Sequence, residues 1–153
     1  MGNIKTLWQN RNFRKLLFTF GIMFGTANTY GTLVGVIADK KGYSDSDASV
    51  FGGTFIFGGI IGSGVLGTFV ESTQKYKLSI LFICAIALSG QLSFIGTLDT
   101  GLLWPAGISA FLLGFVLAIL PVGIDFAVET TFPVPEPIST GLIMSFSQII
   151  GIF

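Results

Sequence analysis

Few side chains in this sequence can bind or transfer anything, and those few lie in or beside long apolar segments. Asp125 and Glu129 are four residues apart, so a helix would carry both carboxylates on one face. Acidic side chains inside a membrane commonly relay protons. These two lie near the end of an apolar segment, where a charge is tolerated. We therefore predict a structural role in which they pair with Lys75, Lys77 or Arg14.

A second chemical group is the primary amide of Gln148, which lies in the otherwise apolar segment that begins at Ile138. In lipid, an amide either hydrogen-bonds a neighbouring helix or faces the interior of a bundle, where it can bind a solute. Both interpretations stay open for Gln148. Asn28 and Gln91 have the same chemistry, and for them a hydrogen bond between helices is the favoured interpretation.

The composition excludes several other classes of protein. Hydrophobic residues make up 51% of the chain and charged residues only 10%, whereas ordinary globular domains have about 25% charged residues. Eight basic and eight acidic residues give a net charge of zero, so nothing indicates a nucleic-acid partner. The sequence has no histidine, and Cys84 is its single cysteine. We therefore expect no enzyme activity, no metal site and no cofactor.

The apolar segments have the length of membrane spans. A helix that crosses a bilayer needs about 20 mostly apolar residues. Four segments meet this requirement, and a fifth stops at the last residue; they are residues 16–38, 48–70, 78–98, 102–126 and 138–153. The short links force neighbouring helices to run antiparallel. We predict an all-α, polytopic helical membrane protein, with residues 1–153 as one incomplete transmembrane domain of four full spans and a truncated fifth.

Basic residues predict how these spans are oriented. The residues before the first span include Lys5, Arg11, Arg14 and Lys15 and no acid. Such an excess of positive charge marks the cytosolic side. Alternation of the spans then places Lys75, Lys77 and the proline-rich link at 132–137 on the cytosolic side as well. The predicted location is an integral, multi-pass protein of the plasma membrane or an organelle membrane, with a cytosolic N-terminus.

Boundary residues and glycines give further detail. Ser44 and Asp47 have the spacing of a capping box that opens the second span, and Pro121 should kink the fourth span near its end. Pairs of glycines with G-x-x-x-G spacing, which let helices approach closely in lipid, are Gly21–Gly25, Gly31–Gly35 and Gly58–Gly62. They favour either static close packing or the sliding surfaces of a transporter.

The link between the second and third spans resembles a known transporter motif. In residues 67–77, Gly67 is followed by Glu71 and then by Lys75 and Lys77. This pattern is similar to the cytoplasmic signature of the major facilitator superfamily, in which the glycine lets two helices touch and the acid accepts from a neighbouring helix N-terminus or a basic side chain.

The C-terminal residues resemble one branch of that superfamily. They read Gly-Ile-Asp-Phe-Ala-Val-Glu-Thr-Thr-Phe-Pro at 123–133, then Glu136, Ser-Thr-Gly-Leu at 139–142 and Gln-Ile-Ile-Gly-Ile at 148–152. This succession is similar to the feline leukaemia virus subgroup C receptor-related transporters. The resemblance extends over nearly the whole chain and assigns it to the seventh to eleventh of twelve helices, within the C-terminal half.

The resemblance implies alternating-access movement of a small organic solute, either choline- or ethanolamine-like or haem-like. It also implies that Gln148 corresponds to an amide that the family places at its substrate. Where the family often has a Phe-Tyr pair, this chain has Ala27 and Asn28. Tyr30 lies two residues further on, about 200° around an ideal helix. The partners implied are the lipid bilayer and a missing N-terminal six-helix half or another chain.

Two sets of candidate residues follow from these arguments. The candidates for solute binding are Gln148, Tyr30 and Asn28. The candidates for closing the cytoplasmic side are Gly67, Glu71, Lys75, Lys77, Asp125, Glu129 and Glu136. The alternative function is that of a non-transporting membrane fragment or a receptor-like interaction subunit, because five helices cannot enclose a cavity between two halves.

Overall fold

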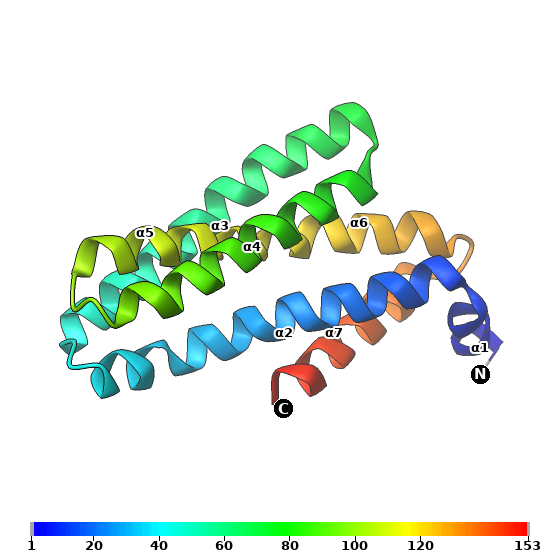
Figure 1. Ribbon diagram of the computed structural model, residues 1–153. Coiled ribbons are helices and arrows are strands. Elements are labelled where there is room, and N and C mark those ends of the chain that lie inside the picture. The colour runs from blue at the N-terminus through cyan, green and yellow to red at the C-terminus, as the bar shows by residue number, and fades with distance from the viewer. Residues whose placement is uncertain (1, 153) are drawn as a thin grey trace.

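A computed structural model describes residues 2–152, with side chains from residue 6 onward, as a bundle of long helices (Figure 1). The helices are α1 (Gly2–Gln9), α2 (Arg11–Lys40), α3 (Asp45–Thr73), α4 (Tyr76–Leu98), α5 (Leu103–Gly114), the 3₁₀ turn η1 (Phe115–Ala118), α6 (Ile119–Thr131) and α7 (Glu136–Ile152). No strand occurs within the described residues. The predicted all-α architecture is confirmed.

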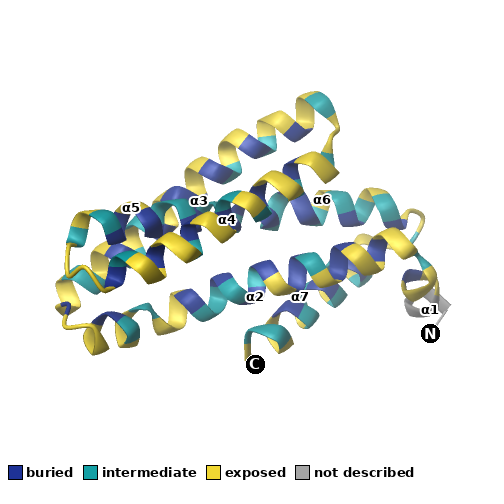
Figure 2. Ribbon diagram, in the orientation of Figure 1, coloured by how far each residue is buried: buried dark blue, intermediate teal, exposed yellow. Residues whose placement is uncertain are grey.

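The outer surface of the bundle carries many large apolar side chains. Leu92 is 72% exposed, Leu81 66% and Ile60 63%, and Figure 2 shows exposed residues along the full length of α3 and α4. Within the described residues, four helices are long and apolar enough to cross a membrane: Arg11–Lys40, Asp45–Thr73, Tyr76–Leu98 and Leu103–Thr131. Exposed apolar surface of this extent indicates contact with a membrane or with another protein segment. The limits of the segments within the bilayer stay a prediction.

The fourth long helix differs from the expected one in both length and regularity. It extends to Thr131 rather than ending near residue 126, and the α-helical pattern is interrupted by η1. Pro121 explains the interruption, because proline has no N–H to donate to the carbonyl of Leu117 and its ring crowds that carbonyl. Residues 115–118 therefore tighten into a 3₁₀ turn. The proline-rich link is correspondingly short, because α7 already begins at Glu136.

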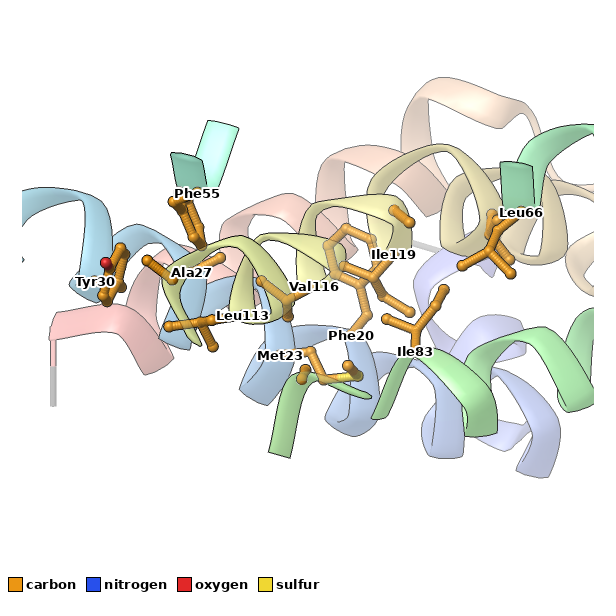
Figure 3. Packing of buried hydrophobic residues seen from close by; sticks show 14 of the residues in the cluster. Phe20, Met23, Ala27, Tyr30, Phe55, Leu66, Ile83, Leu113, Val116 and Ile119 are labelled. Atoms are coloured by element: carbon orange, nitrogen blue, oxygen red, sulfur yellow. The ribbon is translucent and has the colours of Figure 1, made fainter. Parts of the chain in front are cut away.

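Glycines bring this central helix into backbone contact with its neighbours. A Cβ atom at Gly114 would overlap the Phe55 carbonyl oxygen of α3, and one at Gly58 would overlap the Phe111 carbonyl oxygen of α5. A Cβ at Gly90 of α4 would lie 2.5 Å from the Leu113 nitrogen. The larger core side chains, among them Phe20, Ile83, Leu113, Val116 and Ile119, fill the space around this contact (Figure 3).

The G-x-x-x-G pairs differ in whether another helix packs against them. Gly21 and Gly25 lie against Phe146, Ser147 and Ile150 of α7, and Gly58 and Gly62 lie against α5 and η1. A Cβ atom at Gly31 or Gly35 would meet nothing within 4 Å. The same holds for Gly67, so the expected close contact of that glycine with another helix is not present within the described residues.

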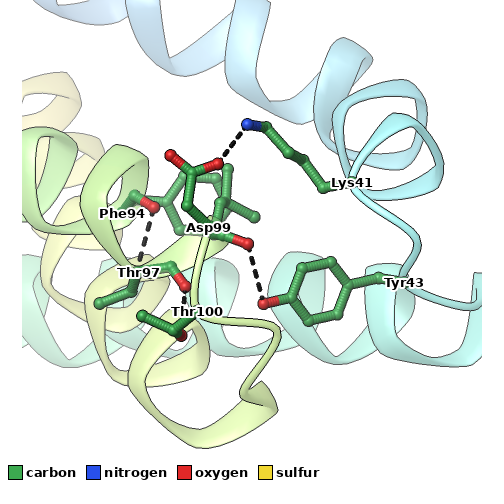
Figure 4. A network of polar contacts seen from close by, with 7 residues as sticks. Lys41, Tyr43, Phe94, Thr97, Asp99 and Thr100 are labelled. Carbon is green, nitrogen blue, oxygen red and sulfur yellow. Dashed lines mark hydrogen bonds and ion pairs between the residues drawn. The ribbon is translucent and has the colours of Figure 1, made fainter.

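At one end of the bundle, polar contacts join the loop after α2 to the loop after α4 (Figure 4). Lys41 forms an ion pair with Asp99. The Tyr43 hydroxyl donates to the carbonyl oxygens of Leu98 at 3.3 Å and Leu102 at 3.4 Å. Beside them, Ser44 and Asp47 form the predicted capping box of α3. These contacts hold the two helical hairpins together at this end.

At the other end, residues 2–15 are helical apart from one break. They form α1, a break at Asn10, and the first turn of α2. The Asn10 side-chain oxygen accepts from the backbone N–H groups of Asn12 at 3.0 Å and Phe13 at 3.2 Å, and its Nδ2 donates to the Thr130 carbonyl oxygen at 2.9 Å. One amide therefore caps α2 and joins it to the end of α6. The side chain of Lys5 lies outside the described residues.

We expect Asn10→Ala to destabilise the chain by roughly 2 kcal/mol, about half from the lost helix cap and half from the lost bond to Thr130. The measurement is thermal unfolding of the purified chain in detergent, followed by circular dichroism. Asn12→Ala is the control, because the side chain of Asn12 is exposed and its backbone contact survives the change. Equal unfolding curves for the two variants would contradict the role of Asn10.

Candidate functional site

Two side chains that are 120 residues apart in the sequence meet on the face formed by α2 and α7. Asn28 Nδ2 donates to Gln148 Oε1 at 3.4 Å. Asn28 lies near the middle of α2, well away from both helix ends. The structure therefore brings together two of the three residues expected to bind a solute.

Close backbone packing of α2 on α7 positions this pair. A Cβ atom at Gly25 would lie 3.1 Å from the Gly151 nitrogen, and one at Gly151 would lie 3.3 Å from the Gly25 carbonyl oxygen. Thr29 Oγ1 donates to those same two residues, at 3.0 Å to each carbonyl oxygen. Glycine spacing indicated a close contact of this kind, but the contribution of Thr29 was not predicted from the sequence.

The amide pair lies at the surface of the helical bundle. Gln148 is exposed and Asn28 is partly exposed. Each amide uses one group in the bond between them, and the structure assigns no further partner to the Gln148 Nε2 or the Asn28 Oδ1 within residues 6–152. Exposed amide groups at mid-span are costly in lipid, because hydrocarbon supplies no hydrogen bonds. This face therefore suits water, a polar solute or another polar surface.

Tyr30 lies elsewhere. It is only 7% exposed, and its ring packs on Phe55 at 4.7 Å and on Phe94 at 5.2 Å between ring centroids. Its hydroxyl has no hydrogen-bond partner in the described structure. The side chain thus belongs to the contact of α2 with α3 and α4, and it does not join Asn28 and Gln148 on the face toward α7.

The residues expected to close the cytoplasmic side are arranged more loosely than predicted. Asp125 and Glu129 are exposed, and within residues 6–152 the sole ion pair is Lys41 with Asp99. The predicted pairing of these two acids with Lys75, Lys77 or Arg14 is therefore wrong for this structure. The same end also contains Glu71 and Glu136, both exposed.

An aromatic contact replaces the predicted ion pairs at this end. The rings of Tyr76 and Phe126 stack with centroids 5.4 Å apart and planes at 22°, and this joins the start of α4 to α6. Glu129 lines the shallow hollow beside this stack, together with Lys75 and Lys77. Glu129 and the two lysines line the same hollow and form no direct ion pair.

Metal ligands do not gather in the part of the chain that the structure describes. No group of three or more His, Cys, Asp or Glu side chains there is close enough to hold an ion. The Cys84 thiol donates to the Met23 sulfur at 3.0 Å. This bond joins α4 to α2.

Long apolar helices with an apolar exterior define a multi-pass integral membrane protein. The comparisons with known proteins narrow this class. The chain is 34% identical to the human choline/ethanolamine transporter FLVCR2 over 99% of its length, and 33% identical to the mouse choline/ethanolamine transporter FLVCR1 over 99%. It is also 32% identical, over 99% of its length, to an uncharacterized MFS-type transporter of Caenorhabditis elegans. No family model matches the chain.

The chain spans 29% of the length of the human relative and 27% of that of the mouse relative. These proteins are named as transporters and not as enzymes. The chain is thus similar, over nearly its whole length, to the feline leukaemia virus subgroup C receptor-related transporters of the major facilitator superfamily. The resemblance seen in the sequence, to the C-terminal half of that family, is confirmed.

Proposed function

We propose that this chain is part of a longer transporter that moves a small organic solute of the choline or ethanolamine type by alternating access. The main observation in support is the surface amide pair of Asn28 and Gln148 at mid-span. The names of the relatives support the class of solute, because they describe choline/ethanolamine transporters. In this proposal the face formed by α2 and α7 turns toward the remainder of the transporter and lines the path of the solute.

The chemistry of the pair fits such a solute. Choline and ethanolamine share a hydroxyl group on a two-carbon arm, and a primary amide can both donate to and accept from a hydroxyl. The free Nε2 of Gln148 and Oδ1 of Asn28 supply one donor and one acceptor. A quaternary ammonium has no N–H, so it needs aromatic rings, each worth about 0.5–2 kcal/mol. Tyr30, the single aromatic residue among the predicted solute-binding candidates, is buried on another face, so in this proposal the rings come from other residues of the transporter.

In the same proposal the end of the bundle that contains the chain's N-terminus is cytosolic, as the basic residues at 11–15 indicate. Glu71, Lys75, Lys77, Asp125, Glu129 and Glu136 then lie at the cytosolic end. They form no direct ion pairs with one another in this structure, and in this proposal they pair with other segments when that side closes. The end that contains Lys41 and Asp99 lies on the opposite side.

A chimaera tests this function. The chain replaces the matched 155-residue segment of human FLVCR2, and uptake of labelled choline and ethanolamine is measured in cells, with labelled haem as a second class of solute. We expect saturable choline or ethanolamine uptake well above that of cells with an empty vector. A chimaera that reaches the membrane and transports neither amine would contradict the proposal and favour the alternative of a non-transporting membrane fragment or interaction subunit.

A further inference from the structure

A groove follows the seam between α2 and α4 on the side of the bundle away from α7. These two helices run side by side (Figure 1) but are separated by three consecutive hollows of about 220, 260 and 210 Å³. The first and second hollows share Thr19, and the second and third share Thr26, Gln91 and Leu113. Along α4 the groove extends from Lys77 to Leu98, about 32 Å at 1.5 Å per residue. This matches the roughly 30 Å thickness of a bilayer's hydrocarbon core.

The groove is basic at one end. Lys15 of α2 and Lys77 of α4 line the first hollow, with Asn12 and Thr19 beside them. Neither lysine has an acidic partner in the described structure, although Glu129 lines the adjacent hollow together with Lys77. The hollow also adjoins the start of α4, which has no side-chain cap and no acid in its first turn. Two ammonium groups from different helices and an uncapped helix N-terminus all favour an anion here.

The groove becomes apolar directly beyond the lysines. Leu16, Ile80 and Phe126 form the inner wall of the first hollow, and Met23, Ala87 and Val116 continue it in the second. A free phosphate would occupy the basic end and leave this wall uncovered. A molecule with an anionic head and a long hydrocarbon tail would cover both parts.

We propose that this groove binds an anionic phospholipid, with its phosphate between the Lys15 and Lys77 ammonium groups and an acyl chain along α2 and α4 toward Met23. Basic pockets between membrane helices commonly hold anionic lipid head groups. The site is distinct from the amide pair of Asn28 and Gln148, which lies on the face toward α7. It therefore stands whether or not the chain takes part in transport.

Native mass spectrometry of the full chain, released from detergent micelles, tests the site. The chain is titrated with phosphatidylglycerol and, separately, with phosphatidylcholine of the same acyl chains. We expect roughly tenfold tighter binding of phosphatidylglycerol. Lys15→Gln combined with Lys77→Gln should abolish this preference. No preference in the unchanged chain would overturn the proposal and leave the groove to be covered by a helix of another polypeptide segment.

A matched control removes the same charge at the same end of the bundle. Arg11→Gln combined with Lys75→Gln changes two exposed basic residues that do not line the first hollow. This control should keep the preference within about twofold. A loss equal to that of the double lysine variant would show diffuse charge attraction rather than a site, and would overturn the proposal.

Two further experiments test whether an acyl chain occupies the groove. Thr19→Trp fills the junction of the first and second hollows while keeping both lysines, and it should weaken phosphatidylglycerol binding about tenfold. Inorganic phosphate, added at the concentration of the lipid, should not compete. Unchanged binding by Thr19→Trp, or effective competition by phosphate, would identify a site for a free anion and overturn the proposal. Circular dichroism checks that every variant keeps its helices.

Discussion

Replacement of Gly114 by alanine is expected to destabilise the bundle by about 3 kcal/mol, the upper part of the range for overpacked cores. The added Cβ would overlap the Phe55 carbonyl oxygen and would also lie 3.1 Å from the Gly59 nitrogen. A side chain could rotate away, but here the obstacle is the backbone of α3, so the whole helix must shift. That shift would open the close backbone contact of α5 with α3.

The matched control is Gly53→Ala on α3. A Cβ at Gly53 would meet nothing within 4 Å, and alanine in a helix is favoured over glycine by roughly 0.5–1 kcal/mol. We therefore expect this variant to be unchanged or slightly more stable. Thermal unfolding in detergent measures both. Similar midpoints for the two variants would show that α3 and α5 are less closely packed than the structure indicates.

Gln148→Ala is expected to lower choline uptake by the chimaera roughly tenfold. The reason is the loss of one hydrogen bond to the solute, worth about 1–1.5 kcal/mol, together with the loss of the partner that orients Asn28. The readout is the initial rate of uptake against choline concentration, normalised to the amount of protein at the membrane. Equal uptake by the unchanged and substituted chimaeras would remove Gln148 from the solute path.

The neighbouring residue supplies the control for Gln148. Ile149 is 55% exposed and has no polar group, so Ile149→Ala should keep uptake within about twofold. Gln148→Asn retains the amide but shortens its reach, and it should give an intermediate rate. If the alanine variants at both positions lose the same activity, the effect belongs to the packing of α7 and not to the amide.

The long helices could be predicted from the sequence because their cause is local. A run of about 20 apolar residues is sufficient to define a span, and the capping box at Ser44 and Asp47 is contained within four residues. The bond from Asn10 to Thr130 could not be predicted in this way. Thr130 is close to Asn10 only after α6 has packed beside α2.

The candidate site was predicted only in part, for a similar reason. Spacing along one helix marks Gly58 and Gly31 equally, yet α5 covers the first and nothing in the described structure covers the second. Asn28 and Gln148 could each be singled out as amides in apolar segments. Their contact is a property of two helices that cross, and no pattern within either helix contains it.

The 3₁₀ turn at Phe115–Ala118 has a geometrical consequence for the helix that contains it. Each 3₁₀ residue advances about 120° around the axis, against about 100° in an α-helix. Four such residues therefore set α6 about 80° out of phase with α5 and lengthen the rod by about 2 Å. Before the 3₁₀ turn the helix packs mainly on α3 and α4, and after it the helix also packs on α2. This rotation sets the direction in which Asp125 and Glu129 project. A helical wheel drawn with 100° per residue throughout would place them on a different face.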